Sequence, residues 1–183
     1  MNPLAIVTPV SRAAPMAFLI GLILLAVLDG VKTWYGLSLI SADGGGGNFG
    51  NISMGLFLLL LVFVSFLFIN RRRDADKGIM LFLLPVILAA VVSAIGAAIM
   101  MGVASFGLMG QYAETVGRDV MTAAQDPSFQ AEFQTWVEGQ PELAVGMMQP
   151  AAWGGFAAFW GITLLFGLWF MSMKSESVAE TDE

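Results

Sequence analysis

Asp29 and Lys32 are the only charged residues of this chain that lie well inside an apolar segment. That segment runs from about residue 13 to 40. Residues three apart on a helix share a face, so the two side chains can pair. Charged groups within a membrane helix often serve ion or proton binding. Asp29 stands about 24 Å along a helix from Ala13, in the outer third of a hydrocarbon layer about 30 Å thick, where Lys32 can reach the interface. We expect a pair that sets helix depth, with a proton or ion site as the alternative.

The other residue types exclude most site chemistry. The chain has no Cys and no His, which removes thiolate nucleophiles, disulfides and imidazole ligands together. Its 12 Met residues include Met100-Met101 and Met147-Met148, and thioethers can bind Cu(I). Without Cys or His beside them, we interpret these Met residues as apolar packing. No catalytic residue, metal site or cofactor is predicted, and the protein is not expected to be an enzyme.

A short basic cluster separates two apolar runs that carry no charge. It consists of Arg71, Arg72, Arg73 and Lys77, with Asp74 and Asp76 between them. Short loops rich in Lys and Arg stay on the cytoplasmic side of a membrane, whereas acidic residues contribute little to orientation. The cluster is therefore expected to set the orientation of the chain in the membrane or to form a contact surface for a partner. Its two acidic residues suggest a folded corner in which Arg and Asp pair.

Composition and the apolar runs predict an all-α integral membrane four-helix bundle. The hydrophobic share is 57% and the charged share 12%, with a mean hydropathy of +0.79, whereas globular proteins carry about 25% charged residues. A single membrane domain, residues 1–183, is expected. Its spans lie at about 13–40, 53–70, 78–102 and 150–173, with an outer loop at 110–149 and a tail at 174–183. The third run is long enough to be tilted or broken near Gly102–Gly110, and Pro150 is expected to begin the fourth span.

The charges of the loops predict one orientation. Arg12, the basic cluster and Lys174 fall on one side of the predicted spans. The loop from 111 to 142 carries one basic residue, Arg118, against Glu114, Asp119, Asp126, Glu132, Glu138 and Glu142. Because basic loops stay inside, both termini are predicted to be cytoplasmic and the acidic loop extracytoplasmic.

The acidic loop is predicted to contain an amphipathic helix. Asp126-Pro127 is typical of an N-cap followed by Pro in the first turn, and Gly139 of a stop. Between them, apolar residues recur at helical spacing at Phe129, Phe133, Trp136 and Val137. We expect this helix to lie on the outer leaflet or to cap the bundle, with binding to lipid or to a protein left open. The Gly-rich stretch 44–47 is expected to be a loose connection.

Small residues recur at every fourth position of the third predicted span. One row consists of Ala90, Ala94, Ala98 and Gly102, and a second of Ala89, Ser93 and Ala97. Small residues let helix backbones approach closely in lipid. The fourth span offers Gly154 and Ala158 as counterparts. We therefore expect the third and fourth spans to pack as a tight hairpin.

The stretch from Ile69 to Gly78, leading into Leu81-Phe82-Leu83-Leu84-Pro85, resembles the turn of the YhaH-type family of small bacterial inner-membrane proteins of unknown function. Val10-Ser11-Arg12 is similar to that family's entry into its first helix. The resemblance covers residues 8 to about 100. It departs from the family at Asp76, where the family has Gly, and at Ile79-Met80, where it has a Trp pair. The resemblance implies a bacterial inner membrane and no activity.

Two functions remain open. The first, which we favour, is association: a scaffold, accessory subunit or envelope factor with another membrane protein or a second copy as partner. The alternative is a small oligomeric transporter or channel that uses Asp29 and Lys32. The lipid bilayer is an expected partner in either case, and nucleic acid is not.

Overall fold

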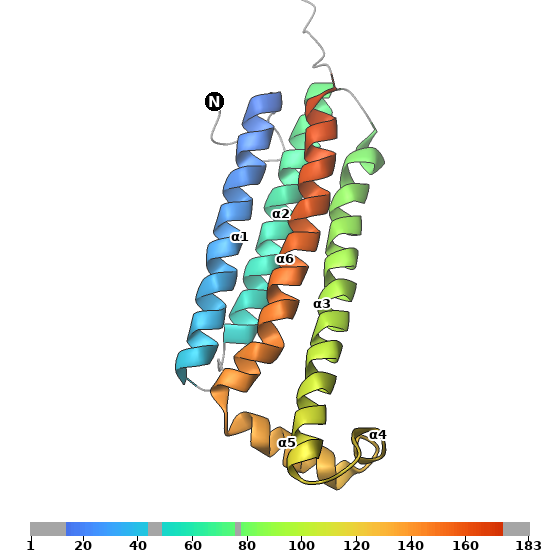
Figure 1. The fold of residues 1–183 in the computed structure, drawn as a ribbon. Coiled ribbons are helices and arrows are strands. Elements are labelled where there is room, and N and C mark those ends of the chain that lie inside the picture. Colours follow the sequence, from blue (N-terminus) through green and yellow to red (C-terminus); the bar gives the residue numbers. More distant parts are fainter. Residues whose placement is uncertain (1–13, 44–48, 76–77, 174–183) are drawn as a thin grey trace, which may run out of the picture. The chain divides into compact units, whose positions relative to one another are not determined.

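The computed structural model describes residues 14–43, 49–75 and 78–173, and every regular element in these ranges is a helix. The predicted glycine-rich connection, the tail from 174, and Asp76 and Lys77 lie outside the described residues. Four helices are long: α1 (Pro15–Asp43), α2 (Phe49–Ala75), α3 (Ile79–Thr115) and α6 (Pro141–Met171). Two short helices, α4 (Val120–Ala123) and α5 (Pro127–Glu138), connect α3 to α6 (Figure 1). The all-α prediction is confirmed.

Each long helix contains a stretch that is apolar and long enough to cross a bilayer. These stretches are Pro15–Leu39, Ile52–Arg73, Met80–Thr115 and Val145–Met171. Many of their large apolar side chains face outward, among them Val27, Ile87 and Leu165. Such exposure is expected where lipid is the solvent. The chain is a membrane protein with four apolar helices, and those helices contact the bilayer.

Two predicted boundaries differ from the structure. α3 continues unbroken through Gly102 and Gly110 to Thr115, so the break is absent and the alternative, a tilt, stays a prediction. α6 begins at Pro141, and Pro150 lies inside it rather than at its start. A proline at the first position of a helix sacrifices no hydrogen bond, and Pro141 takes that position. Membrane helices tolerate an internal Pro when neighbouring groups satisfy the freed carbonyl.

The chain divides into two compact units, each made of segments from several helices. The first unit contains the described residues up to Gly30, Met54–Val91 and those from Ala158 onward. Its core is aromatic, with one fully buried Phe from each long helix: Phe18, Phe68, Phe82 and Phe170. The Phe68 ring meets Phe18 edge-on at 5.2 Å and Phe170 at 5.6 Å, and Phe82 stacks on Phe170 at 4.2 Å. These rings join the four helix segments of the unit.

The second unit contains Val31–Ser53 and Val92–Ala157. Here α3 and α6 pack closely, as the hairpin prediction requires. The Ser93 hydroxyl donates a 2.7 Å hydrogen bond to the carbonyl oxygen of Gly155. A Cβ on Gly155 would lie 3.3 Å from Ser93 Oγ and 3.4 Å from Ala97 Cβ. A Cβ on Gly154 would collide with Met100 Sδ. Both glycines therefore permit the close approach.

The contact uses the second row of small residues on α3 rather than the first. Ser93 is buried and Ala97 half-buried, whereas Ala94, Ala98 and Gly102 are exposed. Of the first row only Ala90 is half-buried, and Ala158 on α6 is also half-buried. The two rows lie on neighbouring faces of one helix, and spacing alone does not distinguish them. A polar side chain distinguishes them here, since Ser93 needs the partner that α6 provides.

Candidate functional site

Asp29 lies inside the first unit, where α6 binds it. Its carboxyl Oδ2 accepts a 2.9 Å hydrogen bond from the Trp160 indole N–H. Asp29 is 5% exposed and Trp160 is 3% exposed, so the bond is shielded from both lipid and water. A hydrogen bond between buried groups is electrostatically stronger than one in water. Asp29 therefore lies in the interior of the first unit, between α1 and α6, and Trp160 orients its carboxyl.

Lys32 follows one turn later on α1 and is half-buried. Trp34 and Tyr35 are exposed beyond it, as expected of residues at a membrane interface. The predicted pairing of Asp29 with Lys32 stays a prediction. Trp160 is a partner of Asp29 that sequence spacing did not indicate, because the two residues are 131 positions apart.

Two contacts define how α1 and α6 align in this unit. Trp160 binds Asp29, and a Cβ on Gly167 would lie 2.6 Å from Leu22 Cδ1. From Leu22 to Asp29 α1 advances by seven residues, while the contacting positions on α6 go back by seven, from Gly167 to Trp160. These segments are therefore antiparallel (Figure 1). Thr163 lies between Trp160 and Gly167, and by this register it stands opposite Ala26. Its hydroxyl is fully buried and has no hydrogen-bond partner among the described residues.

Arg71 occupies the opposite end of the first unit and is fully buried. Its Nε donates a 3.1 Å hydrogen bond to the carbonyl oxygen of Phe170, and its Nη2 donates to the carbonyl oxygen of Met173. Carbonyls at the end of a helix lack partners within that helix, and the helix dipole favours a cation there. Arg71 therefore caps α6.

The predicted basic cluster is thus not uniform. Arg72 is half-buried and Arg73 is exposed, and both stand in the last turn of α2. Asp74 belongs to the same turn, whereas Asp76 and Lys77 lie outside the described residues. The proposed pairing of Arg with Asp across the corner stays a prediction. Within the cluster, Arg71 is buried in the interior, whereas Arg73 is exposed at the surface of α2.

The second unit includes a folded region that we call the cap, residues 109–138, which comprises the end of α3, α4 and α5. Its core contains Ala113, Ala123 and Phe129, with Met109, Tyr112 and Val120 packed against them. The Tyr112 ring lies 5.3 Å from Phe129, 6.0 Å from Phe133 and 5.2 Å from Trp136. The predicted amphipathic helix is present as α5, and its apolar face packs on the end of α3.

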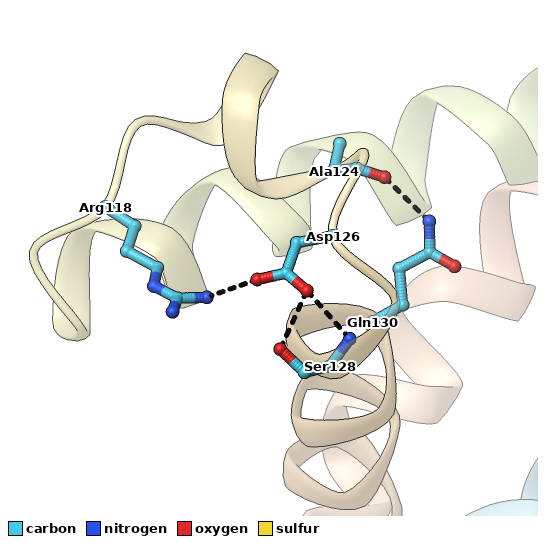
Figure 2. Close-up of polar contacts among 5 residues, drawn as sticks. All are labelled: Arg118, Ala124, Asp126, Ser128 and Gln130. Carbon is cyan, nitrogen blue, oxygen red and sulfur yellow. Dashed lines mark hydrogen bonds and ion pairs between the residues drawn. The ribbon is translucent and has the colours of Figure 1, made fainter.

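Side-chain caps define both short helices. Asp119 accepts from the backbone N–H of Thr122 at 3.0 Å and begins α4. Asp126 accepts from the N–H and hydroxyl of Ser128 at 3.0 and 2.7 Å and begins α5, as predicted (Figure 2). Gly139 ends α5. Each helix therefore begins with the acceptor that its free N–H groups require.

Two further side chains, Arg118 and Gln130, join the loop before α5 to the rest of the cap (Figure 2). Arg118 donates to Asp126 at 3.2 Å, and its guanidinium carbon lies 5.9 Å from the centre of the Phe129 ring. Gln130 donates to the carbonyl oxygen of Ala124 at 2.6 Å. The cap is therefore an ordered structure with its own polar contacts.

The capping bonds lower the pKa values of both aspartates. The largest cause for Asp119 is the hydrogen bond from the Thr122 hydroxyl, followed by the Thr122 backbone N–H. For Asp126 the hydroxyl of Ser128 lowers the pKa most, followed by its backbone N–H, and Arg118 contributes less. Donors to the ionised form favour it. Both carboxylates are therefore charged at neutral pH.

Two of the four methionines that could have formed a thioether site, Met100 and Met147, make contacts between α3 and α6. Met147 Sδ accepts a 3.4 Å hydrogen bond from the Ser105 hydroxyl, and Met100 lies against Gly154. No group of three His, Cys, Asp or Glu side chains that could hold a metal ion occurs in the described ranges. These contacts place the two Met residues at the interface of α3 and α6.

Sequence reasoning missed Trp160 as the partner of Asp29, and Thr163 as a buried hydroxyl one turn further along α6. Thr163 carries the only hydroxyl between residues 151 and 171, a signal that could have identified it. Buried Trp N–H groups usually find a hydrogen-bond partner, which was a weaker signal for Trp160. No protein-family model matches the chain, and neither a curated protein nor a solved structure matches it.

Proposed function

We propose that the protein acts by association, as a scaffold, accessory subunit or envelope factor of a bacterial plasma membrane, with the cap as its contact surface. The observation that carries this proposal is the core of the cap, in which Phe129 is fully buried against the end of α3. A flexible loop would not need such a core. The cap therefore presents its surface in a fixed conformation, which lowers the entropic cost of binding.

The length of the connection supports the same role. Helices that pack as neighbours are commonly joined by 2–8 residues. Here residues 116–140 join α3 to α6 and form two helices on the way. A connection that only reversed the chain direction would not require α4 and α5. The additional residues are explained if the surface they build is recognised by a partner.

The charge of that surface indicates the class of partner. Glu114, Glu132 and Glu138 are exposed on the cap, and Asp119 is exposed at the start of α4. Arg118, the only basic residue of the cap, is paired with Asp126. An acidic surface attracts a basic one and repels anionic lipid. The proposed partner is another membrane protein that offers a basic extramembrane segment on the same side as the cap.

The orientation is part of the proposal. Arg72 and Arg73 at the end of α2 support a cytoplasmic location for that end, by the positive-inside rule. Both termini would then be cytoplasmic and the cap extracytoplasmic. The resemblance of residues 69–85 to the YhaH-type turn supports a bacterial inner membrane.

Affinity purification of the full chain in mild detergent tests the association role. A stoichiometric partner should copurify with the unmodified chain, and less of it with a Glu114→Gln, Glu132→Gln double variant. A Gln125→Asn variant changes an exposed neutral residue of the cap and serves as the matched control. Partner recovery should also fall as salt is raised, because screening weakens contacts between exposed charges. Equal recovery with the double variant would refute the role of the acidic surface.

A small oligomeric transporter or channel is the second candidate, and the burial of Asp29 favours it. Reconstitution of the purified chain in liposomes tests this function. It predicts ion flux that an Asp29→Asn variant lacks, with equal incorporation of both proteins.

A further inference from the structure

The buried contact between α1 and α6 in the first unit contains three groups that can exchange hydrogen bonds. Asp29 supplies a carboxyl, Trp160 an indole N–H and Thr163 a hydroxyl, and none is more than 5% exposed. The indole N–H is a donor only. It is directed at Oδ2 of Asp29 at 2.9 Å. One carboxyl oxygen of Asp29 is thus assigned to Trp160.

Thr163 is placed to serve the same carboxyl. By the register of the two helices, Asp29 is level with Trp160, and Thr163 is three residues further along α6. Three residues correspond to about 4.5 Å along the axis. Side chains on a helix lean toward its N-terminus. Because the two helices are antiparallel, Asp29 leans toward the level of Thr163, and Thr163 leans toward the level of Asp29.

The residue between them is small. Ala26 stands opposite Thr163 and is half-buried, so no large side chain of α1 separates the hydroxyl from the carboxyl one turn away. A threonine in a helix can bond back to the carbonyl one turn earlier. The hydroxyl of Thr163 makes no such bond and has no other partner in the described part of the chain. A buried hydroxyl without a partner is unusual in folded proteins.

We propose that Asp29, Trp160 and Thr163 form a reversible proton-binding site between α1 and α6. In the deprotonated state the carboxylate accepts from Trp160, and rotation of the Thr163 side chain would let its unpartnered hydroxyl donate to the same carboxylate. When a proton binds to the second carboxyl oxygen, that O–H donates to Thr163, whose hydroxyl now accepts. A hydroxyl can take either role, so Thr163 can serve the carboxyl of Asp29 in both protonation states. The indole bond to Oδ2 is retained in each.

The charged groups around the site are few. Within the first unit, the described parts of α2, α3 and α6 carry ionisable residues only at 71–74. Arg71 lies beside Phe170, ten residues from Trp160 and therefore about 15 Å along α6. Lys32, one turn beyond Asp29 on α1, is the nearest cation in the sequence. Asp74, at the end of α2, is the only other acidic residue in the described part of that unit, so proton uptake at Asp29 would change the charge of its interior.

Infrared difference spectroscopy of the full chain in lipid nanodiscs tests the site. Spectra recorded as the pH is lowered should show a growing carbonyl-stretch band of a protonated carboxylic acid in a water-poor environment. Asp29→Asn should abolish that band. Thr163→Val should shift its frequency, because the acid loses its acceptor, and Thr163→Ser should restore the original position. Trp160→Phe should shift it independently.

Three results would overturn the inference. No pH-dependent band, or one that persists in Asp29→Asn, would exclude Asp29 as the proton acceptor. A band unchanged by Thr163→Val would exclude the hydroxyl. A response to sodium at constant pH, in place of a response to pH, would indicate a metal-cation site. Helical circular dichroism and gel filtration verify that each variant is folded. The result is independent of the association role, since partner recovery is measured separately.

Discussion

Arg71 Nε donates a hydrogen bond of 3.1 Å to the carbonyl oxygen of Phe170, although the two residues are 99 positions apart. The guanidinium holds the end of α6 against the end of α2, and the ring of Phe170 is at the same time packed between Phe68 and Phe82. A residue from the cluster that is predicted to orient the chain is thus part of its interior. We therefore expect orientation and folding to depend on different members of one basic cluster.

Arg71→Met should lower the thermal stability of the purified protein and leave its orientation unchanged. Each hydrogen bond from a charged donor contributes about 1.5–3 kcal/mol, and the variant loses those to Phe170 and Met173. Arg73→Met is the matched control, because Arg73 is exposed. This variant should lose at most a few tenths of a kcal/mol of stability, so its Tm should change by about 1 °C or less. Reporter fusions at the termini and in the cap would measure orientation. An equal Tm for both variants would show that the capping bonds contribute little.

Gly167→Val should weaken the contact between α1 and α6. A Cβ at Gly167 would lie 2.6 Å from Leu22 Cδ1, so a branched side chain must displace the buried side chain of Leu22 or move the two helices apart. Overpacking of this kind costs about 1–3 kcal/mol. Gly161→Val, on the same helix, is the control because nothing lies within 4 Å of a Cβ there. Thermal unfolding followed by circular dichroism measures both. Similar melting curves for the two variants would contradict the close contact at Gly167.

The four apolar helices could be predicted because the hydropathy and length of a segment decide its insertion into a membrane, and both can be read from the sequence. The start of α5 at Asp126 and its end at Gly139 were predictable for a similar reason, since capping is a local property of the backbone. The partner of Asp29 was not predictable, because Trp160 reaches it only through the packing of distant segments. Arg71 and Arg73 look alike in the sequence, and only the end of α6 makes them different. The two rows of small residues on α3 posed the same problem, which Ser93 resolves.

Phe129→Ala should unfold the cap while the long helices remain. The ring of Phe129 is fully buried, and truncating a buried Phe costs about 3–5 kcal/mol, which is large for a core of this size. Hydrogen exchange of the α4 and α5 amides should become fast, with exchange in α2 unchanged. Met121→Ala is the control because Met121 is 65% exposed on the same region. Protection of α5 that survives in Phe129→Ala would mean that this helix is held by contacts other than the core of the cap.

Acid should loosen the cap through its two capping aspartates. The pKa values of Asp119 and Asp126 are lowered by bonds that exist only in the folded cap. A carboxyl whose folded pKa lies below its unfolded pKa stabilises the fold above the unfolded pKa, about 3.9 for Asp. This stabilisation is lost as the pH falls through the folded value. Proteolysis of α5 by pepsin should therefore accelerate as the pH falls below about 4.

The double variant Asp119→Asn, Asp126→Asn separates this effect from general acid unfolding. An amide oxygen can still accept the capping hydrogen bonds, yet it does not titrate in this range. The variant cap should be less stable than the original at pH 7, because the charge at each helix start is gone. Its cleavage rate by pepsin should then depend less on pH below about 4 than that of the unmodified chain. Parallel pH profiles for the two proteins would show that the acid sensitivity of the cap arises from other carboxyl groups.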